Sequence, residues 1–279
     1  MTTLLAVLAH PDDESFGIGG TLALYARSGV DVYLICATGG EAGTIDPEHM
    51  QGYASVAELR SAELRCAAEK LGLKEVFMLG YRDSGMPGSP DNQDPEAQIN
   101  HSLEEVAARI VKRIRTLKPE VVVTFDPIGG YRHPDHIHIH QATVLAFEKA
   151  GDESFHPEVG APFNPSALYF HIFRRGFFKV IVKLMPLIGQ NPRKAGRNKD
   201  IDLKSLADVD FPSHVRVNIS ATKDIKIAAS ACHVSQGGLQ VRRGLFGLLA
   251  RLTGDHEDFM RAYPPVVGGS IRKTDLFDV

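Results

Sequence analysis

The chain has 279 residues, of which 43% are hydrophobic, so it is long enough for one large domain with its own apolar core. Its formal net charge of −3 gives no electrostatic basis for binding nucleic acid, and we expect no such partner. The three cysteines, Cys36, Cys66 and Cys232, are far apart and include no Cys-x-x-Cys pair, so their spacing indicates neither a disulfide framework nor a thiolate zinc site.

The location of the protein is predicted from its first residues. They carry no basic segment followed by a small-residue cleavage site, and the apolar run at residues 4–9 is too short to span a membrane. We therefore expect a cytoplasmic, reducing location. Cys36 lies in an apolar run and is expected to be a buried small hydrophobe.

Strand-like and helical patterns alternate along the chain. Apolar runs predict strands at residues 4–9, 30–37, 75–79, 120–125, 167–173 and 215–219. Amphipathic patterns predict helices at residues 19–28, 56–71, 103–117 and 134–149. This alternation predicts a Rossmann-like, doubly wound α/β fold with a mostly parallel sheet and helices on both faces. We expect one domain over residues 1–279, with a core at 1–170 and a smaller C-terminal α/β extension at 171–279 that borders the site.

Two polar segments fall where predicted strands end. His10-Pro11-Asp12-Asp13-Glu14 follows the first strand, and residues 131–136 follow the fourth. In a sheet of order 3-2-1-4 these two strands are neighbours at the topological switch point, where open α/β sheets bind ligands. The two segments are therefore expected to face each other. For Glu14 an alternative stays open, in which its carboxylate only caps the next helix and stabilises the positive end of the helix dipole.

Histidines and carboxylates at this edge are typical of a metal centre. Four of the 12 histidines lie within residues 133–140. His10, Asp13 and His136 can supply three ligands to one Zn²⁺ and leave the fourth position for water. Other divalent metals could replace zinc at such ligands.

A second carboxylate beside the ligands is predicted to act as a base. A zinc-bound water has a pKa lowered to about 7, and Asp12 would take its proton. His138 and His140 are expected not to be ligands, because His136 already completes the set.

The paired segments resemble those of a known family. His10-Pro11-Asp12-Asp13-Glu14 together with His133-Pro134-Asp135-His136 is similar to the PIG-L/LmbE-like zinc-dependent deacetylases, which hydrolyse substrates containing N-acetylglucosamine. Residues 80–86, Gly-Tyr-Arg-Asp-Ser-Gly-Met, resemble the branch that handles mycothiol precursors and mycothiol conjugates. Residues 233–236, His-Val-Ser-Gln, resemble a further family element. The likeness is strong over roughly the first 150 residues and thin beyond them.

The resemblance implies the same ligands and base, and further roles. His133 would protonate the leaving amine or stabilise developing charge, Asp135 would orient that machinery, and Tyr131 would polarise the amide carbonyl. Arg60 would contact the substrate. The alternative for Arg60 is a surface ion pair with Glu63, three residues further along the same helix.

The predicted reaction is removal of an acyl group, most simply acetyl, from the nitrogen of a small amino-sugar substrate. Arg82 and Asp83 lie on a loop expected to border the site and are candidates for binding sugar hydroxyls or a charged group. Two alternatives are an amidase of a thiol conjugate resembling mycothiol and a metal-binding module without catalysis. A dinucleotide-binding loop is disfavoured, because Leu22 stands where the fingerprint needs glycine.

Two apolar stretches with basic neighbours lie late in the chain. Residues 177–188 are followed by basic residues up to Lys199, and residues 245–250 lie beside Arg242, Arg243 and Arg251. The simpler interpretation is that both pack on the core or on a neighbouring subunit of a homo-oligomer. The alternative is an apolar, basic-rimmed wall near the site that touches a lipid-linked sugar or an anionic membrane surface. Neither stretch is long enough to span a membrane.

Overall fold

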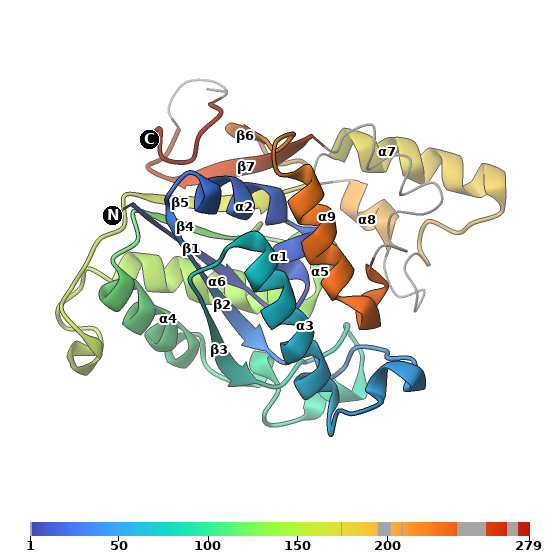
Figure 1. Ribbon diagram of the computed structural model, residues 1–279, viewed down its shortest axis with the longest axis horizontal. Coiled ribbons are helices and arrows are strands. Elements are labelled where there is room, and N and C mark those ends of the chain that lie inside the picture. Colours follow the sequence, from blue (N-terminus) through green and yellow to red (C-terminus); the bar gives the residue numbers. More distant parts are fainter. Residues whose placement is uncertain (1, 174, 195–201, 208, 239–254, 267–272) are drawn as a thin grey trace.

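The computed structural model of the chain describes residues 2–173, 175–194, 202–207, 209–238, 255–266 and 273–279. Within them, strands form one sheet of order β3-β2-β1-β4-β5-β7-β6 (Figure 1). The strands are β1 (Thr3–Leu8), β2 (Asp31–Thr38), β3 (Glu75–Tyr81), β4 (Val121–Phe125), β5 (Ala167–Ile172), β6 (Val215–Asn218) and β7 (His256–Tyr263). β1 to β5 pair in parallel, whereas β7 is antiparallel to both β5 and β6. The predicted doubly wound, mostly parallel α/β fold is confirmed.

β1 occupies the centre of the parallel part of the sheet. All six of its residues are buried, as expected for a strand covered on both faces. It pairs with β2 from Thr3 to Leu8, and with β4 from Leu4 to Ala6. The carboxyl ends of β1 and β4 therefore lie side by side, which is the predicted switch point.

Helices cover both faces of the sheet (Figure 1). α2 (Gly19–Arg27), α3 (Val56–Leu71) and α9 (Lys223–Cys232) pack together on one face, and α4 (Leu103–Leu117) and α6 (Pro134–Lys149) pack on the other. The other helices of the described residues are α1 (Asp13–Phe16), α5 (Gly129–Arg132), α7 (Arg175–Leu184) and α8 (Leu203–Ala207). Single 3₁₀ turns are η1 (Pro47–Met50), η2 (Pro90–Gln93), η3 (Gln98–Asn100), η4 (Pro157–Val159), η5 (Met185–Ile188) and η6 (Val234–Gln236).

Local signals explain why the long helices were predictable. Ser55 accepts a hydrogen bond from the Glu58 N–H at the start of α3, and Ser102 does the same for the Glu105 N–H at the start of α4. Gly72, with φ of 76°, ends α3 in the left-handed conformation that glycine adopts at low cost. The predicted bounds of α3, α4 and α6 agree with the structure at both ends.

β7 and α9 were not predicted. Two carboxylates break the apolar pattern of β7, yet Glu257 and Asp258 are only 7% and 4% exposed. Glu257 accepts hydrogen bonds from the N–H groups of Gly20 and Thr21 and from Lys226. Buried carboxylates that find such partners remain inside the protein, and a search for apolar periodicity does not register them.

The cysteine spacing does not indicate a disulfide framework, yet one disulfide forms. Cys66 on α3 and Cys232 at the end of α9 are bonded, with their Cα atoms 5.8 Å apart. The two residues are 166 positions apart in the sequence, and only the packing of α3 against α9 brings them together. Cys36 keeps a free thiol and is buried, as expected.

The first late apolar stretch forms α7 and η5, which lie to one side of the sheet (Figure 1). Met185, together with Leu203 and Leu206, forms a second, small apolar cluster, and Ile128 and Tyr131 pack against it. This stretch therefore reaches the loop after β4, which carries part of the predicted site.

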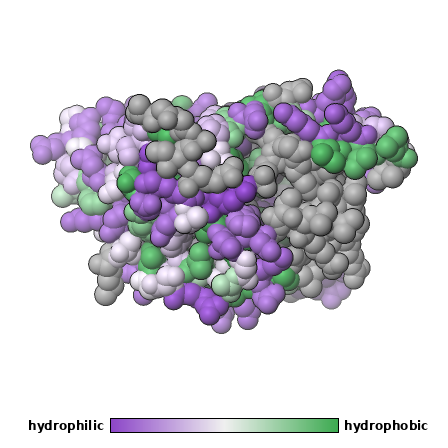
Figure 2. Space-filling view, turned by 90° about the horizontal axis from the view of Figure 1, so that it is seen from above, coloured by the Kyte–Doolittle hydropathy of each residue, from purple (hydrophilic) through white to green (hydrophobic). Residues whose placement is uncertain are grey.

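The opposite side of this stretch faces solvent. Val180, Leu184 and Leu187 are 50%, 40% and 79% exposed. Apolar surface is visible at the right-hand end of the view in Figure 2, where α7 and η5 lie. Residues 242–251 and 195–201 lie outside the described residues. No helix in the described part of the chain is long and apolar enough to cross a membrane.

Candidate functional site: a histidine–carboxylate centre

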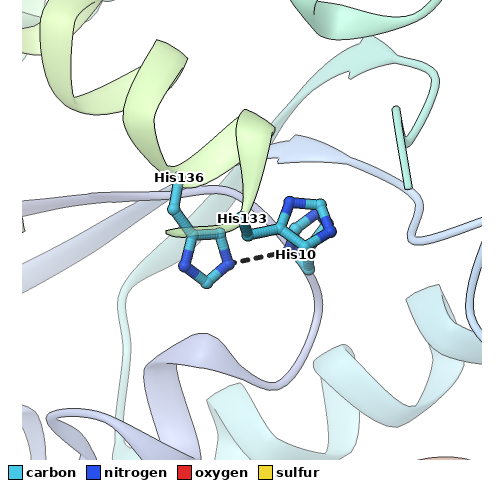
Figure 3. Close-up of side chains that lie close together, drawn as sticks. All are labelled: His10, His133 and His136. Atoms are coloured by element: carbon cyan, nitrogen blue, oxygen red, sulfur yellow. Dashed lines mark hydrogen bonds between the residues drawn. The ribbon is translucent and has the colours of Figure 1, made fainter. Parts of the chain in front are cut away.

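The structure brings the two predicted segments together at the switch point. His10 follows β1, His133 is the N-cap of α6, and His136 lies in the first turn of that helix. Figure 3 shows the three imidazole rings converging from these elements. All three histidines are buried, with exposed fractions of 5%, 6% and 1%.

The three predicted metal ligands lie at mutually close distances. Nδ1 of His10 is 3.0 Å from Nε2 of His136 (Figure 3). Oxygens of Asp13 lie 3.4 Å from that His136 nitrogen and 3.6 Å from the His10 nitrogen. Ligands about 2.0–2.1 Å from a tetrahedral ion are about 3.3 Å apart, so this spacing suits a single metal.

The outer hydrogen bonds of the histidines support the same assignment. Nδ1 of His136 is 3.2 Å from the carbonyl oxygen of Gly129, and Nε2 of His10 is 3.1 Å from a carboxylate oxygen of Asp135. If each outer nitrogen donates its proton, the two inner nitrogens present lone pairs to each other and to the Asp13 carboxylate. Acceptors gathered in this way repel one another unless a cation lies between them, and histidine ligands of metals are held by this kind of outer bond. The residues therefore fit a divalent metal.

A glycine is required beside this centre. A Cβ atom added to Gly129, which has φ of 62°, would lie 2.7 Å from the Cβ of His136. Any side chain here would displace the start of α6. The residue also supplies the carbonyl that orients the His136 ring.

The electrostatics of the cluster also favour a cation. Burial lowers the pKa of His136 to about 3, which keeps its imidazole neutral, as a ligand must be. Burial acts against the charged form of Asp13, but His136 and His10 outweigh it and lower the pKa of that carboxyl. Burial also opposes the charged form of His10, yet Asp83, Asp13 and Asp135 raise its pKa well above the ordinary value. Carboxylates that attract a proton this strongly also attract a metal ion.

A second set of candidate metal ligands lies in the same cluster. His10, His133 and His136 also offer ligand atoms within 4.8 Å of one another. Nδ1 of His133, however, accepts the N–H of Asp135 at 3.2 Å. Its other nitrogen lies 4.0 Å from Asp83. We favour Asp13 as the third ligand because it approaches both inner nitrogens more closely.

Asp12 lies beside this centre and is paired with Arg60. Nη2 of Arg60 donates to Oδ2 of Asp12 at 3.0 Å and to the carbonyl of Pro11 at 2.6 Å, while Nη1 donates to the carbonyl of Gly40 at 2.9 Å. Burial raises the pKa of Asp12 to about 7, with Arg60 opposing the rise and Asp13 adding to it. A carboxylate with this pKa suits a general base near neutral pH.

Arg60 is not on the surface. It is 3% exposed, and the Glu63 carboxylate instead accepts the N–H and Oγ–H of Ser235, each at 2.7 Å. The guanidinium reaches the site because Gly40 has no side chain, since a Cβ there would lie 2.0 Å from Nη1.

Asp135 and Asp83 hold the histidines from the far side. Asp135 is fully buried, and Ser84 donates to both of its oxygens. Its nearest histidine nitrogen is that of His10, at 3.1 Å, whereas the nearest nitrogen of His133 is 3.8 Å away. Asp83 lies 3.5 Å from His10.

A pocket of about 520 Å³ opens above these residues. Its lining consists of His10, Asp12, Ala42, Gly43, Thr44, Arg60, Asp83, Gly85, Met86, Pro87, Gly88, Ser89, Tyr131, His133 and Gln236. The predicted residues Asp12, Tyr131 and His133 thus share one cavity. Arg82 is not part of the lining, and its guanidinium instead pairs with Asp91 and Asp94 at 2.9 and 3.0 Å.

Two parts of the pocket lining were not among the site residues predicted from the sequence. Residues 42–44 follow β2, whose carboxyl end lies at the same sheet edge, so the strand order could have pointed to them. Gln236 comes from η6, late in the chain, and only its resemblance to a family element singled it out. His138 and His140 contact the backbone carbonyls of His101 and Phe125 and belong to no candidate ligand group of the described residues.

A buried histidine–carboxylate centre at the switch point of a doubly wound sheet defines an α/β protein whose site could hold a divalent metal. Residues 5–147 match the PIG-L family, described as GlcNAc-PI de-N-acetylase. The chain belongs to this family.

Relatives of known name extend the match beyond the core. The chain is 38% identical over 242 residues to 1D-myo-inositol 2-acetamido-2-deoxy-alpha-D-glucopyranoside deacetylase of Rhodococcus jostii, covering 84% of this chain and 81% of the relative. It is 34% identical over 296 residues to the protein of the same name from Streptomyces avermitilis, covering 99% and 96%. Among solved structures, N,N'-diacetylchitobiose deacetylase from Pyrococcus horikoshii has the same fold, with a TM-score of 0.66 and 21% identity over 93% of this chain and 83% of that one.

Proposed function

We propose that this protein hydrolyses the acetamido group of an amino sugar, releasing acetate and the free amine, with Zn²⁺ as cofactor. The observation that carries this proposal is that the half-buried Asp12 carboxylate shares a pocket with His10, beside the His10–Asp13–His136 centre. The named activity of the Rhodococcus and Streptomyces relatives supports this reaction and suggests N-acetylglucosaminyl-inositol as a substrate.

Zinc is proposed because two imidazoles and one carboxylate suit it. His10, Asp13 and His136 would hold the ion. When bound, zinc supplies a water of lowered pKa and polarises the amide carbonyl.

Asp12 handles the proton in this proposal. Its Oδ2 accepts a hydrogen bond from Arg60, and we assign to its other oxygen the role of accepting a proton from the attacking water. The hydroxyl of that water bonds to the carbonyl carbon, and the C–N bond then breaks. Asp12 returns the proton to the leaving nitrogen, so the products are the carboxylic acid and the amine.

Tyr131 and His133 stabilise the charge that develops. Burial raises the pKa of Tyr131 above its ordinary value, so its hydroxyl stays protonated and donates to the carbonyl oxygen. Burial, with His10 and His136, holds the pKa of His133 well below its ordinary value. Since Nδ1 of the neutral His133 ring accepts the Asp135 N–H, its proton lies on Nε2. This N–H group donates to the developing charge.

The pocket suits a small polar substrate. Its volume of about 520 Å³ lies in the usual range of about 300–1,000 Å³ for small-molecule sites. Arg60 and Asp83 are proposed to contact sugar hydroxyls, and Arg82 to hold the loop that carries Asp83. We propose that residues 1–279 act as one domain, with residues 171–279 completing the site through Gln236.

We also propose a cytoplasmic location. The Cys66–Cys232 disulfide is at odds with it, because disulfides persist mainly in oxidising compartments. Fractionation of the source cells, with thiols trapped by acid and alkylated at lysis, tests both the location and the oxidation state.

A substrate panel tests the proposed function. Acetate release is measured from N-acetylglucosamine, N-acetylglucosaminyl-inositol, diacetylchitobiose and a mycothiol-type conjugate, with chelator and after zinc is restored. We expect chelator-sensitive, zinc-restored hydrolysis of an N-acetyl amino sugar. Hydrolysis of none of them by metal-loaded protein would refute the proposal, and cleavage of the thiol conjugate alone would replace it with an amidase.

A further inference from the structure

The backbone of Asp12 is strained. Its φ is 130° and its ψ is −26°, outside the regions that non-glycine residues ordinarily adopt. Such a conformation costs about 1–3 kcal/mol and persists only where the surroundings impose it. Some group must therefore hold the Asp12 peptide in place.

Glu14 provides that constraint from within the same turn. Its Oε2 accepts the N–H of Asp12 at 3.0 Å. On the other side of the residue, the Asp12 carbonyl accepts the N–H groups of Ser15 and Phe16 at 3.0 and 2.9 Å. The peptide is thus fixed at both ends, while Arg60 fixes the side chain.

The Glu14 carboxylate is itself held by a residue from the far end of the chain. Its Oε1 lies 2.7 Å from Nε2 of His233 and accepts the hydroxyl of Ser15. Both the Glu14 and the His233 side chains are 0% exposed. His233 directly follows α9, and the Ser235–Glu63 bonds anchor the next turn to α3.

A role in capping α1 does not explain this arrangement. α1 has only four residues, Glu14 lies inside it, and its N-cap makes no side-chain capping bond. A stabilising ion pair is also an insufficient reason, because buried charge pairs can often be replaced by apolar groups without loss of stability. An apolar pair, however, could not accept the N–H of Asp12.

We infer that Glu14 and His233 are positioning residues for Asp12, and that together they hold its carboxylate at the angle from which it takes the proton of the attacking water. The inference rests on the proposed function, in which Asp12 is the base. Through His233, the C-terminal extension would help to position the base, a role that neither polar segment of the core indicates.

The first test compares Glu14→Ala with Glu14→Gln. The alanine removes the acceptor for the Asp12 N–H, and a misplacement near 1 Å costs about 100-fold in rate. We expect kcat of Glu14→Ala to fall by about 10- to 100-fold, with KM and metal content per folded chain little changed. Glutamine keeps one acceptor oxygen and should restore most of the rate. Wild-type kcat in Glu14→Ala would overturn the inference.

Glu257→Ala is the matched control. Glu257 is also a buried glutamate that accepts two backbone N–H groups and binds a cationic side chain of α9, but it lies outside the pocket lining. We expect its loss to lower the melting temperature and to leave kcat unchanged. If Glu14→Ala does not fold, His233→Ala takes its place, since it leaves Glu14 without its buried partner.

A double-mutant cycle separates the inference from the proposed function. If Glu14 acts through Asp12, Glu14→Ala should cost no further activity in an Asp12→Asn background. An equal loss in both backgrounds would overturn the inference while leaving the base assignment intact. Near-wild-type activity of Asp12→Asn alone would instead refute the proposed role of Asp12.

A crystal structure of Glu14→Ala gives a readout independent of activity. We expect φ of Asp12 to relax to a negative value. An unchanged Asp12 backbone would contradict the inference, because other contacts would then suffice to impose the strain.

Discussion

Replacing Arg60 with glutamine should shift the pH dependence of catalysis. Burial raises the pKa of Asp12 to about 7, and Arg60 is the largest influence opposing that rise. Nη2 of Arg60 lies 3.0 Å from the Asp12 carboxylate. At an effective dielectric constant of about 20, unit charges about 4 Å apart interact by about 4 kcal/mol, or up to about three pKa units. Neighbouring arginines typically shift the pKa of aspartates by about 1–3 units.

The sign of the shift follows from the role of Asp12 as a base. Activity is present when Asp12 is deprotonated and is lost as the pH falls through its pKa. Without the guanidinium this pKa rises, so the acidic limb of kcat/KM should move to higher pH by at least about one unit.

The assay is a pH–rate profile between about pH 5 and about pH 9, with metal content measured on each sample. Arg60→Lys is the control, because it keeps the charge and loses the forked bonds to Pro11 and Gly40. Its limb should stay close to that of the wild type. The maximum value of kcat/KM in each profile reports the loss of substrate contact. The pH at which the acidic limb falls reports the pKa of Asp12. An unshifted limb in Arg60→Gln would refute the reasoning.

Further predictions concern chemistry, stability and surface. Asp12→Asn should keep the metal and lose about two to four orders of magnitude in kcat, the usual range for a general base, and activity within a few-fold of wild type would move the base elsewhere. The denatured, unreduced protein should titrate one thiol, and Cys66→Ser should lose up to about 5 kcal/mol of unfolding free energy, because the 166-residue separation closes a long loop. Three thiols without reductant would contradict the disulfide. Arg115, 3% exposed, donates to backbone carbonyls within residues 149–160, so Arg115→Met should lose at least about 3 kcal/mol in urea unfolding. A loss below about 1 kcal/mol would show that residues 149–160 do not depend on the Arg115 side chain. For α7, we expect no co-sedimentation with anionic liposomes at low salt, and binding there would favour the membrane-facing interpretation of its exposed side.

Much of the fold could be predicted, because its parallel strands are apolar on both faces and its long helices carry their own start and stop signals. Ser55 and Gly72 bound α3 in this way. The strand order then placed His10 opposite His136, although 126 residues separate them. These inferences depend on local patterns and one topological rule.

The remainder depends on tertiary contacts between groups that look unremarkable in sequence. His233 follows an unpredicted helix, and nothing near it in the chain indicates that it reaches Glu14. Cys66 and Cys232 have no informative spacing. Arg82 was predicted to contact the substrate but pairs within its own loop with Asp91 and Asp94, which lie 9 and 12 residues further along the chain.

Metal analysis of the purified protein tests the central claim most directly. The wild type should hold one divalent ion per chain after dialysis, His136→Ala should lose it, and His138→Ala, whose ring contacts the carbonyl of His101, should retain it. Full retention of the metal by His136→Ala would contradict the assignment of the centre to His10, Asp13 and His136.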